Sequence, residues 1–329
     1  MKPSPEAKPA TCLALHGGAG ALPRADMTPA RTAEFHAALH TALREGQRVL
    51  AAGGASLDAV ETTVVWLEDC PLFNAGRGSA FTRDGHVEME ASIMDGATLQ
   101  AGATSLLRGV RNPVRLARRI MERTPHVTLA GEAAERFAKE QGLAFEAPDY
   151  FFTQFRWDAM VRLRGTDHTA LSEDIVVFAE PGSPAATGTV GAVACDAAGN
   201  LAAATSSGGT SNKMAGRIGQ ASIPGAGVYA NNATCAVSCT GHGEAFVRAV
   251  AAHEVSALLE HRGLDLAKAT EIVVRQRLPG RGGLIAVDRA GHCALPFNTE
   301  GMYRGWIDAA GGAHTAIYDE VKDWPTFSA

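Results

Sequence analysis

The sequence predicts an α+β fold, in which helices cover a mostly antiparallel sheet. Candidate strands gather near the start and in the middle of the chain, whereas candidate helices follow one another in blocks. Strict β-α-β alternation is absent, so a doubly wound parallel sheet is the less suitable alternative. Residues that favour turns between antiparallel strands occur at 84–85, 196–200 and 289–291. With 329 residues, of which 46% are hydrophobic, the chain can bury a sizeable core.

The first half of the chain is expected to begin with a short buried strand at residues 11–16. Residues 17–20 are rich in glycine and predict a loop. Apolar residues at helical spacing predict a helix over residues 29–52, and Ser56 is a suitable N-cap for a second helix that ends before Pro71. Further strands are expected at 79–82, 87–94 and 99–107, and further helices at 112–123, 131–141 and 150–163.

The second half opens with a change of composition. Residues 165–188 are rich in Pro, Gly and Ser and predict a surface linker. The linker leads directly into an apolar run at residues 189–195, which predicts a buried strand. Further strands are expected at 201–206, 225–230, 234–239, 283–288 and 292–297, and helices at 242–260 and 265–276.

Composition and motifs exclude several classes of protein. The formal charge is -5 and no basic block is present, so nucleic acid and anionic membranes are poor partners. No apolar run is long enough for a transmembrane helix, and the N-terminus lacks the apolar core of a signal peptide. The six cysteines are scattered without a CxxC pair, which favours reduced thiols and a cytoplasmic location. The fragment Gly18-Ala19-Gly20 is a poor dinucleotide fingerprint, and neither a P-loop nor a GxSxG elbow occurs.

One junction stands out as a candidate for catalysis. The predicted linker ends on Gly188 and the predicted buried strand begins on Thr189. A threonine hydroxyl is a weak nucleophile that needs an adjacent base. If the chain were cut before Thr189, the new α-amine, with an ordinary pKa of about 7.7 to 8.0, could be that base. The structural alternative is a threonine that merely opens a strand after a loop.

The sequence resembles the plant-type L-asparaginase/isoaspartyl peptidase family of N-terminal nucleophile hydrolases over nearly the whole chain. The residues that carry the resemblance are the segments 16–20, 70–76, 94–96, 188–193, 207–209, 212–213, 216–219, 229–232, 240–244 and 296–302.

The resemblance implies a single domain, residues 1–329, that cleaves itself between Gly188 and Thr189. The products are an α chain, 1–188, and a β chain, 189–329, which stay together in a four-layer αββα sandwich of the Ntn-hydrolase type. Members of this family usually pair as a dimer of such heterodimers, so a homo-oligomer is expected. The activity implied is hydrolysis of β-aspartyl dipeptides and, less well, of L-asparagine, through an acyl-enzyme that releases L-aspartate.

The resemblance also assigns catalytic roles. Thr189 is the nucleophile and its amine is the base. Ser207 stands where relatives have a threonine whose hydroxyl supports the nucleophile, and Asn74 helps to orient Thr189. Thr240 and the backbone N–H of Gly241 match the oxyanion hole.

Substrate contacts and ion binding follow in the same way. Arg217 matches the residue that holds the substrate α-carboxylate, and the Gly243 carbonyl matches the acceptor for its α-ammonium. Gln220 departs from the family, which usually has an aspartate there to bind that ammonium. No cofactor is expected for catalysis. A structural sodium ion is implied for a loop whose ligands, mostly carbonyls, are Leu67, Glu68, Cys70, Phe73, Ala75 and Arg77.

Two other functions remain open at this point. A glycosylasparaginase-like amidase would use the same machinery on N-glycosylated asparagine. A weakly active or unprocessed homologue would act as a binding protein, and Gln220 is the main support for it.

Overall fold

The computed structural model describes residues 11–20, 22–165, 188–308 and 310–327. Within them, strands form a large sheet in the order β13-β12-β11-β1-β5-β6-β2-β3-β4 and a small sheet in the order β10-β9-β8-β7. Neighbouring strands are antiparallel except β3 and β4, which are parallel. The predicted α+β class with mostly antiparallel sheets is confirmed. The strands are β1 Cys12–Gly20, β2 Met89–Asp95, β3 Ala101–Leu107, β4 Thr128–Ala130, β5 Val190–Cys195, β6 Leu201–Ser207, β7 Val228–Ala230, β8 Ala236–Gly241, β9 Gly282–Val287, β10 Cys293–Ala294, β11 Gly301–Ile307, β12 Ala313–Ala316 and β13 Val321–Trp324.

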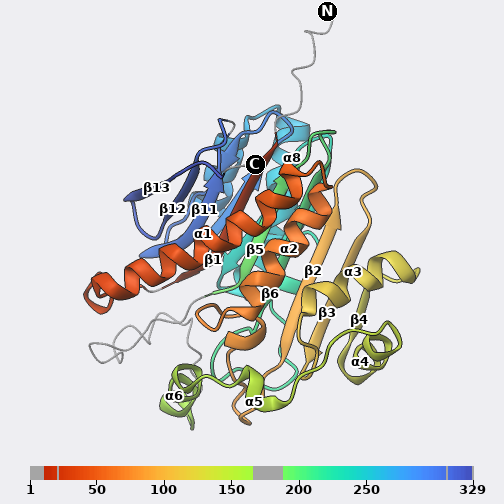
Figure 1. The fold of residues 1–329 in the computed structure, drawn as a ribbon, viewed down its shortest axis with the longest axis vertical. Helices are drawn as coiled ribbons and strands as arrows, with labels where there is room; N and C mark the ends of the chain where they lie inside the picture. The colour runs from red at the N-terminus through yellow and green to blue at the C-terminus, as the bar shows by residue number, and fades with distance from the viewer. Residues whose placement is uncertain (1–10, 21, 166–187, 309, 328–329) are drawn as a thin grey trace, which may run out of the picture.

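Helices α1 (Pro29–Ala51) and α2 (Ser56–Asp69) run across one face of the large sheet, as Figure 1 shows. Thr28 caps α1 because its side chain accepts a hydrogen bond from the backbone of Arg31. Apolar side chains of both helices pack on β1 and β5 in one continuous core. Helix α3 (Pro113–Arg123) packs on β2 and β3 farther along the same sheet.

The opposite face of the large sheet packs on the small sheet. Ala14 and Val193 of the large sheet share an apolar cluster with Ile285 and Ala236 of the small sheet. The other face of the small sheet packs on α7 (Gly243–Ala249), α8 (Ala251–Arg262) and α9 (Leu266–Ile272). The central strand β5 is therefore buried from both sides.

The predicted loop at residues 17–20 is wrong, because β1 continues through it to Gly20. Gly18, Ala19 and Gly20 pair with Tyr303, Met302 and Gly301 of β11. A bulge lies between His16 and Gly18, where Gly18 has φ +118°. Pairing with a distant strand has overridden the local preference of glycine for a turn.

The predicted N-cap at Ser56 is also wrong. Ser56 is the first residue of α2, and Ala55 precedes it without a side-chain cap. The backbone N–H of Ser56 donates instead to Oδ2 of Asp196 at 3.1 Å. The partner is supplied by a residue 140 positions away, which no local pattern could indicate.

Three predicted helices are interrupted. Residues 150–163 form α5 (Pro148–Phe151) and α6 (Gln154–Leu163), and the Thr153 side chain caps the second. Residues 242–260 divide at Val250, which adopts a left-handed conformation with φ 48°. Helix α9 continues as a π-helical turn over Val273–Arg277.

The remaining predicted elements differ mainly at their bounds. The helix expected at 131–141 is α4 (Gly131–Glu140). The short strand expected at 79–82 is reduced to two isolated bridges, from Phe81 to Val87 and from Thr82 to Lys213. Strands β4, β11, β12 and β13 were not predicted. Most of the predicted linker, residues 166–187, lies outside the described residues. None of the helices in the described part is both long and apolar enough to cross a bilayer.

Candidate active site

Thr189 lies directly before β5, between β1 and β6, and only 4% of it is exposed. Its hydroxyl donates to Oγ of Ser207 at the end of β6, at 3.2 Å. The same oxygen accepts a hydrogen bond from Nε2 of Gln220 at 3.0 Å. The structure thus brings together Thr189, Ser207 and Gln220, which are widely separated in the sequence.

The turn after β6 holds Ser207 in place. The backbone N–H of Gly209 donates to Oγ of Ser207 at 2.9 Å. Asn74 binds the same turn from the opposite side, since its Nδ2 donates to the Gly209 carbonyl at 2.6 Å and its own carbonyl accepts from Gly208 at 2.9 Å. Asn74 therefore contacts the turn that follows Ser207, and its hydrogen bonds go to this turn and to Ala80.

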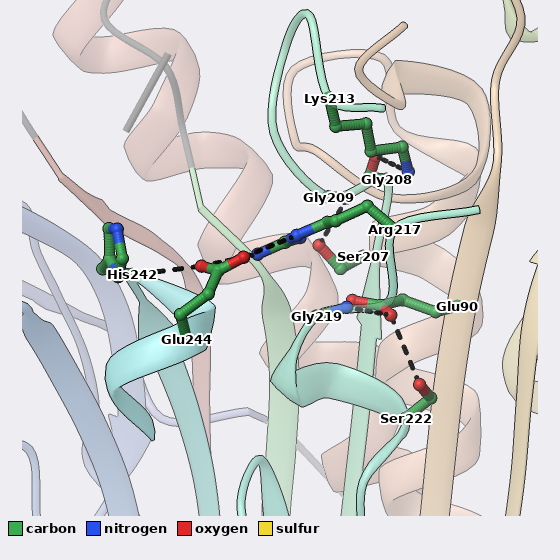
Figure 2. Close-up of polar contacts among 10 residues, drawn as sticks. All are labelled: Glu90, Ser207, Gly208, Gly209, Lys213, Arg217, Gly219, Ser222, His242 and Glu244. Carbon is green, nitrogen blue, oxygen red and sulfur yellow. Dashed lines mark hydrogen bonds and ion pairs between the residues drawn. The ribbon is translucent and has the colours of Figure 1, made fainter. Parts of the chain in front are cut away.

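A buried lysine stabilises this turn as well. Nζ of Lys213 donates to the carbonyl of Gly208 (Figure 2). It also donates to the carbonyl of Glu88. Burial lowers the pKa of Lys213 to about 8, although Glu90 and Glu88 oppose this shift. Sequence reasoning placed Lys213 only within a motif and gave it no role.

The small sheet supplies Thr240 and Gly241 from the end of β8. Oγ1 of Thr240 accepts a hydrogen bond from the backbone of Ala19 on β1 at 3.0 Å. A Cβ placed on Gly188 would lie 2.6 Å from that same oxygen. Gly241 has φ +142° and its Cα faces the Arg281 carbonyl closely, so a side chain does not fit there. Both sheets therefore contribute to the surroundings of the Gly188-Thr189 bond.

The glycine-rich end of β1 is the other neighbour of this bond. A Cβ on Gly18 would lie 2.6 Å from the nitrogen of Gly188 and 2.9 Å from its oxygen. A Cβ on Gly188 would lie 2.9 Å from the Ala19 carbonyl oxygen. The close approach requires glycine at both positions. Sequence reasoning missed this contact because it depends on β1 extending through residues 17–20.

Arg217 is paired with Glu244. Its Nε and Nη2 donate to the two carboxylate oxygens of Glu244 at 3.0 and 3.1 Å, as Figure 2 shows. Burial alone would raise the pKa of Glu244, but the hydrogen bond and charge of Arg217 outweigh burial and lower it. Nδ1 of His242 lies 3.7 Å from the same carboxylate. A fork of this kind fixes the plane and direction of the guanidinium.

Gly243 lies where Arg217 and Gln220 meet. A Cβ on Gly243 would be 2.7 Å from Nη2 of Arg217 and 2.7 Å from Oε1 of Gln220. The predicted substrate contacts Arg217, Gln220 and Gly243 are thus neighbours in the structure.

Gln220 begins a one-turn 3-10 helix, Gln220–Ser222, that Glu90 holds in place. Oε2 of Glu90 accepts from the backbone of Gly219 at 2.8 Å and from Oγ of Ser222 at 3.3 Å (Figure 2). Glu90 is 4% exposed and lies on β2. Sequence reasoning did not find Glu90, because a carboxylate between two apolar residues of a strand is expected to face solvent, whereas β2 is buried on both faces there.

His16 fixes the carbonyl side of Thr189. Nδ1 of His16 lies 2.8 Å from the Thr189 carbonyl oxygen, and Nε2 lies 2.8 Å from Oγ of Ser238. Burial lowers the pKa of His16 to about 3, so the ring is neutral at physiological pH. A carbonyl can only accept, so Nδ1 carries the proton and Nε2 accepts from Ser238. Sequence reasoning included His16 only in a segment that carries the family resemblance and gave it no role.

The segment expected to bind sodium begins with Leu67 and Glu68 in the last turn of α2 and continues to a 3-10 turn, Gly76–Gly78. The Glu68 carbonyl faces the Cα of Gly76, and the Phe73 carbonyl faces the Cα of Gly78. The segment therefore folds back so that its later glycines pack against carbonyl groups of its earlier residues. Oε2 of Glu68 is buried and has no hydrogen-bond partner among the described residues. A hard cation prefers oxygen ligands, so this donor set fits a sodium ion. No cluster of three His, Cys, Asp or Glu side chains suited to a metal occurs in the described part of the chain.

The fold and the site fit one class of protein. A threonine that opens a central strand directly after a glycine, with its hydroxyl held in a hydrogen-bond chain, is typical of hydrolases with an N-terminal nucleophile. The sequence model of one family, described as asparaginase, matches residues 9–317. The chain belongs to this asparaginase family.

Individual relatives agree with this assignment. Isoaspartyl peptidase of Salmonella typhimurium is 50% identical over 311 residues, which cover 94% of this chain and 98% of the relative. Isoaspartyl peptidase of Escherichia coli is 49% identical over 314 residues, covering 94% and 97%. A plant-type L-asparaginase of Pyrobaculum calidifontis is 42% identical over 305 residues, covering 90% and 96%.

Proposed function

We propose that this chain is a self-cleaving threonine amidohydrolase that hydrolyses β-aspartyl dipeptides and, less well, L-asparagine, releasing L-aspartate. The names of the similar proteins support the activity. The observation that carries the mechanism is the hydrogen-bonded hydroxyl of Thr189 at 3.2 Å from Ser207 and 3.0 Å from Gln220. A nucleophile needs such a held orientation to attack in line with a carbonyl.

Activation begins at the bond between Gly188 and Thr189. The Thr189 oxygen attacks the Gly188 carbonyl carbon, the bond to the Thr189 nitrogen breaks, and water hydrolyses the resulting ester. A carboxylate remains on Gly188 and an amine on Thr189. The products are an α chain, 1–188, and a β chain, 189–329. Gly18 and Thr240, which both approach Gly188, support this site of cleavage.

Both chains stay within one domain, a four-layer αββα sandwich of the Ntn-hydrolase type. Apolar clusters support this arrangement, since they join α1 and α2 to the large sheet, one sheet to the other, and the small sheet to α8 and α9. Strands β1 and β5 belong to different chains after cleavage, yet they remain paired from Cys12 to His16.

Turnover uses the same oxygen. The new α-amine of Thr189 takes the hydroxyl proton, and the oxygen attacks the side-chain amide of the substrate. Thr240 and the backbone N–H of Gly241 stabilise the oxyanion, and a single donor of this kind contributes about 3 to 4 kcal/mol. The leaving amine takes the proton, and water then hydrolyses the acyl-enzyme to release aspartate.

Recognition of the substrate falls to the group around Gly243. Arg217 holds the α-carboxylate, because a guanidinium binds carboxylate through parallel hydrogen bonds. The pairing with Glu244 supports this role by fixing the direction of the guanidinium. The Gly243 carbonyl and Oε1 of Gln220 accept from the α-ammonium.

We further propose a structural sodium ion held mostly by carbonyls of Leu67, Glu68, Cys70, Phe73, Ala75 and Arg77, a cytoplasmic location, and a dimer of αβ heterodimers. The positive charge of the ion offsets the partial negative charges of the buried oxygen atoms in this loop. The ion takes no part in catalysis.

The experiment that tests the activity is a substrate panel with the purified protein. Aspartate release is measured from β-aspartyl dipeptides, from L-asparagine and from N-glycosylated asparagine. We expect the highest kcat/KM with a β-aspartyl dipeptide. A preference for the glycosylated substrate would favour the glycosylasparaginase-like alternative, and an intact chain without turnover would favour the binding protein.

A further inference from the structure

We propose that Gln220 is a positioning residue that sets the direction of the hydrogen-bond chain through the Thr189 hydroxyl. The proposal rests on the function proposed above, in which Thr189 is the nucleophile. It concerns an amide that directs the hydroxyl, in addition to the contact of Gln220 with the substrate.

The orientation of the Gln220 amide follows from its surroundings. Nε2 lies 3.0 Å from Oγ1 of Thr189 and 3.5 Å from the carbonyl oxygen of Cys239. A carbonyl oxygen can only accept, so the amide atom that faces it must be the nitrogen. Oε1 lies 2.7 Å from the place that a Cβ on Gly243 would take. The nitrogen end of the amide thus faces two acceptors, and the oxygen end lies beside Gly243.

The direction of the chain follows in turn. Because Nε2 can only donate, the Thr189 oxygen accepts from Gln220 and its own proton points to Ser207. Oγ of Ser207 also accepts from the backbone of Gly209. One lone pair of the Thr189 oxygen is used by Gln220, and the other remains for attack on a carbonyl carbon. A carboxylate at this position could not donate and would compete with Ser207 for the Thr189 proton.

The position of Gln220 is rigid enough for this purpose. Only 2% of the residue is exposed. Glu90 binds both ends of the short helix that carries it, through Gly219 and Ser222 (Figure 2). Because the short helix is held at both ends and Gln220 is buried, its side chain loses little further freedom when it bonds to Thr189.

The absence of charge on the Gln220 side chain has a second consequence for the mature enzyme. The α-amine of Thr189 must lose its proton to act as a base, and a neighbouring carboxylate would raise its pKa. Because the glutamine side chain is uncharged, it exerts no such effect on the α-amine of Thr189. The other titratable groups around the site are His16, Glu90, Lys213, Arg217, His242 and Glu244.

Two substitutions at position 220 separate these effects. Gln220→Met keeps the length of the side chain and removes its hydrogen bonds, whereas Gln220→Glu keeps the shape and replaces the donor by a charge. Gln100→Glu is the matched control. Gln100 is exposed and lies near the Asp95 end of β2, whereas Glu90 lies near the other end. The measurements are the rate of cleavage of the purified precursor, and both kcat and kcat/KM for a β-aspartyl dipeptide between pH 5 and 9.

We expect Gln220→Met to slow both cleavage and kcat at least about tenfold, without moving the acid limb of the pH profile. Gln220→Glu is expected to shift that limb upward by about one pH unit, which a residue remote from the Thr189 amine would not do. Gln100→Glu should match the wild type. Wild-type rates in Gln220→Met, or an unshifted profile in Gln220→Glu, would overturn the proposal while leaving the proposed function intact. A wild-type chain that stays uncleaved and inactive would overturn both.

Discussion

His16 donates a hydrogen bond to the carbonyl oxygen of Thr189, at 2.8 Å, from the neighbouring strand β1. The other ring nitrogen accepts from Ser238 on β8 of the small sheet, and Oγ of Ser238 lies 2.8 Å from Oγ1 of Thr205 on β6. One imidazole therefore connects both sheets to the backbone of the candidate nucleophile. Because its pKa is lowered to about 3, this connection persists at physiological pH.

Replacing His16 tests this connection. His16→Ala leaves the Thr189 carbonyl buried without this donor and removes one of the two partners of Ser238, which keeps Thr205; a buried group that loses its partner costs about 1 to 3 kcal/mol. We expect the free energy of unfolding to fall by about 2 kcal/mol or more, measured by urea denaturation. His86 is exposed, so His86→Ala serves as the control and should change stability little. Equal effects of the two substitutions would contradict the assigned role.

Gly18 tests the close approach of β1 to Gly188. A Cβ on Gly18 would clash with the backbone of Gly188, and Gly18 also has φ +118°. Gly18→Ala should slow cleavage of the precursor at least about tenfold, because the displaced carbonyl is no longer aligned with the attacking oxygen. Denaturing gels over time follow the loss of the 34.3 kDa chain.

The control for this substitution is Gly53→Ala. Gly53 has φ +77° but open space around its Cα, so the variant carries backbone strain without a clash. It should lose about 1 kcal/mol of stability and cleave at the wild-type rate. Normal cleavage in Gly18→Ala would show that this contact plays no part in activation.

Lys213 provides a test in the pH dependence of stability. Its pKa is lowered by burial from 10.5 to about 8 in the folded protein. Between pH 8 and 10.5 the unfolded chain therefore binds more protons at this residue, and the group's contribution to stability increases with pH. Relative to Lys213→Met, the wild type should gain on the order of 2 to 3 kcal/mol across this window.

The measurement for Lys213 is urea denaturation of both proteins at several pH values. Other groups that titrate in this window cancel in the difference between the two proteins. A difference that stays constant with pH would contradict the lowered pKa. Lys268→Met is a suitable control, because Lys268 is exposed on α9 and should give a constant difference.

Sequence reasoning predicted the elements that have strong local patterns. The helix at 29–52 and the strand that starts at Thr189 agree closely with the structure, because periodic apolar residues report local burial. Strand β11 was missed, since Gly301, Arg304 and Gly305 interrupt its pattern, and their burial comes from packing against distant residues. The break at Val250 has no local signal, because valine disfavours a positive φ.

The same limit applies to the site. The Gly188-Thr189 junction could be recognised from composition, because a Pro-, Gly- and Ser-rich segment meets an apolar run there. The partners His16, Glu90 and Lys213 could not, because each binds a backbone group that is far away in the sequence. The pairing of Arg217 with Glu244 and the donation from Gln220 to Thr189 likewise depend on three-dimensional proximity.

The central claim is that Thr189 becomes a new N-terminal residue. Intact mass spectrometry of the purified protein during incubation, with aspartate release assayed in parallel, tests it most directly. The account predicts that the wild type separates into chains 1–188 and 189–329 and that activity rises in step with cleavage, whereas Thr189→Ala stays whole and inactive. A wild-type chain that stays whole while it hydrolyses amides at full rate would contradict the account.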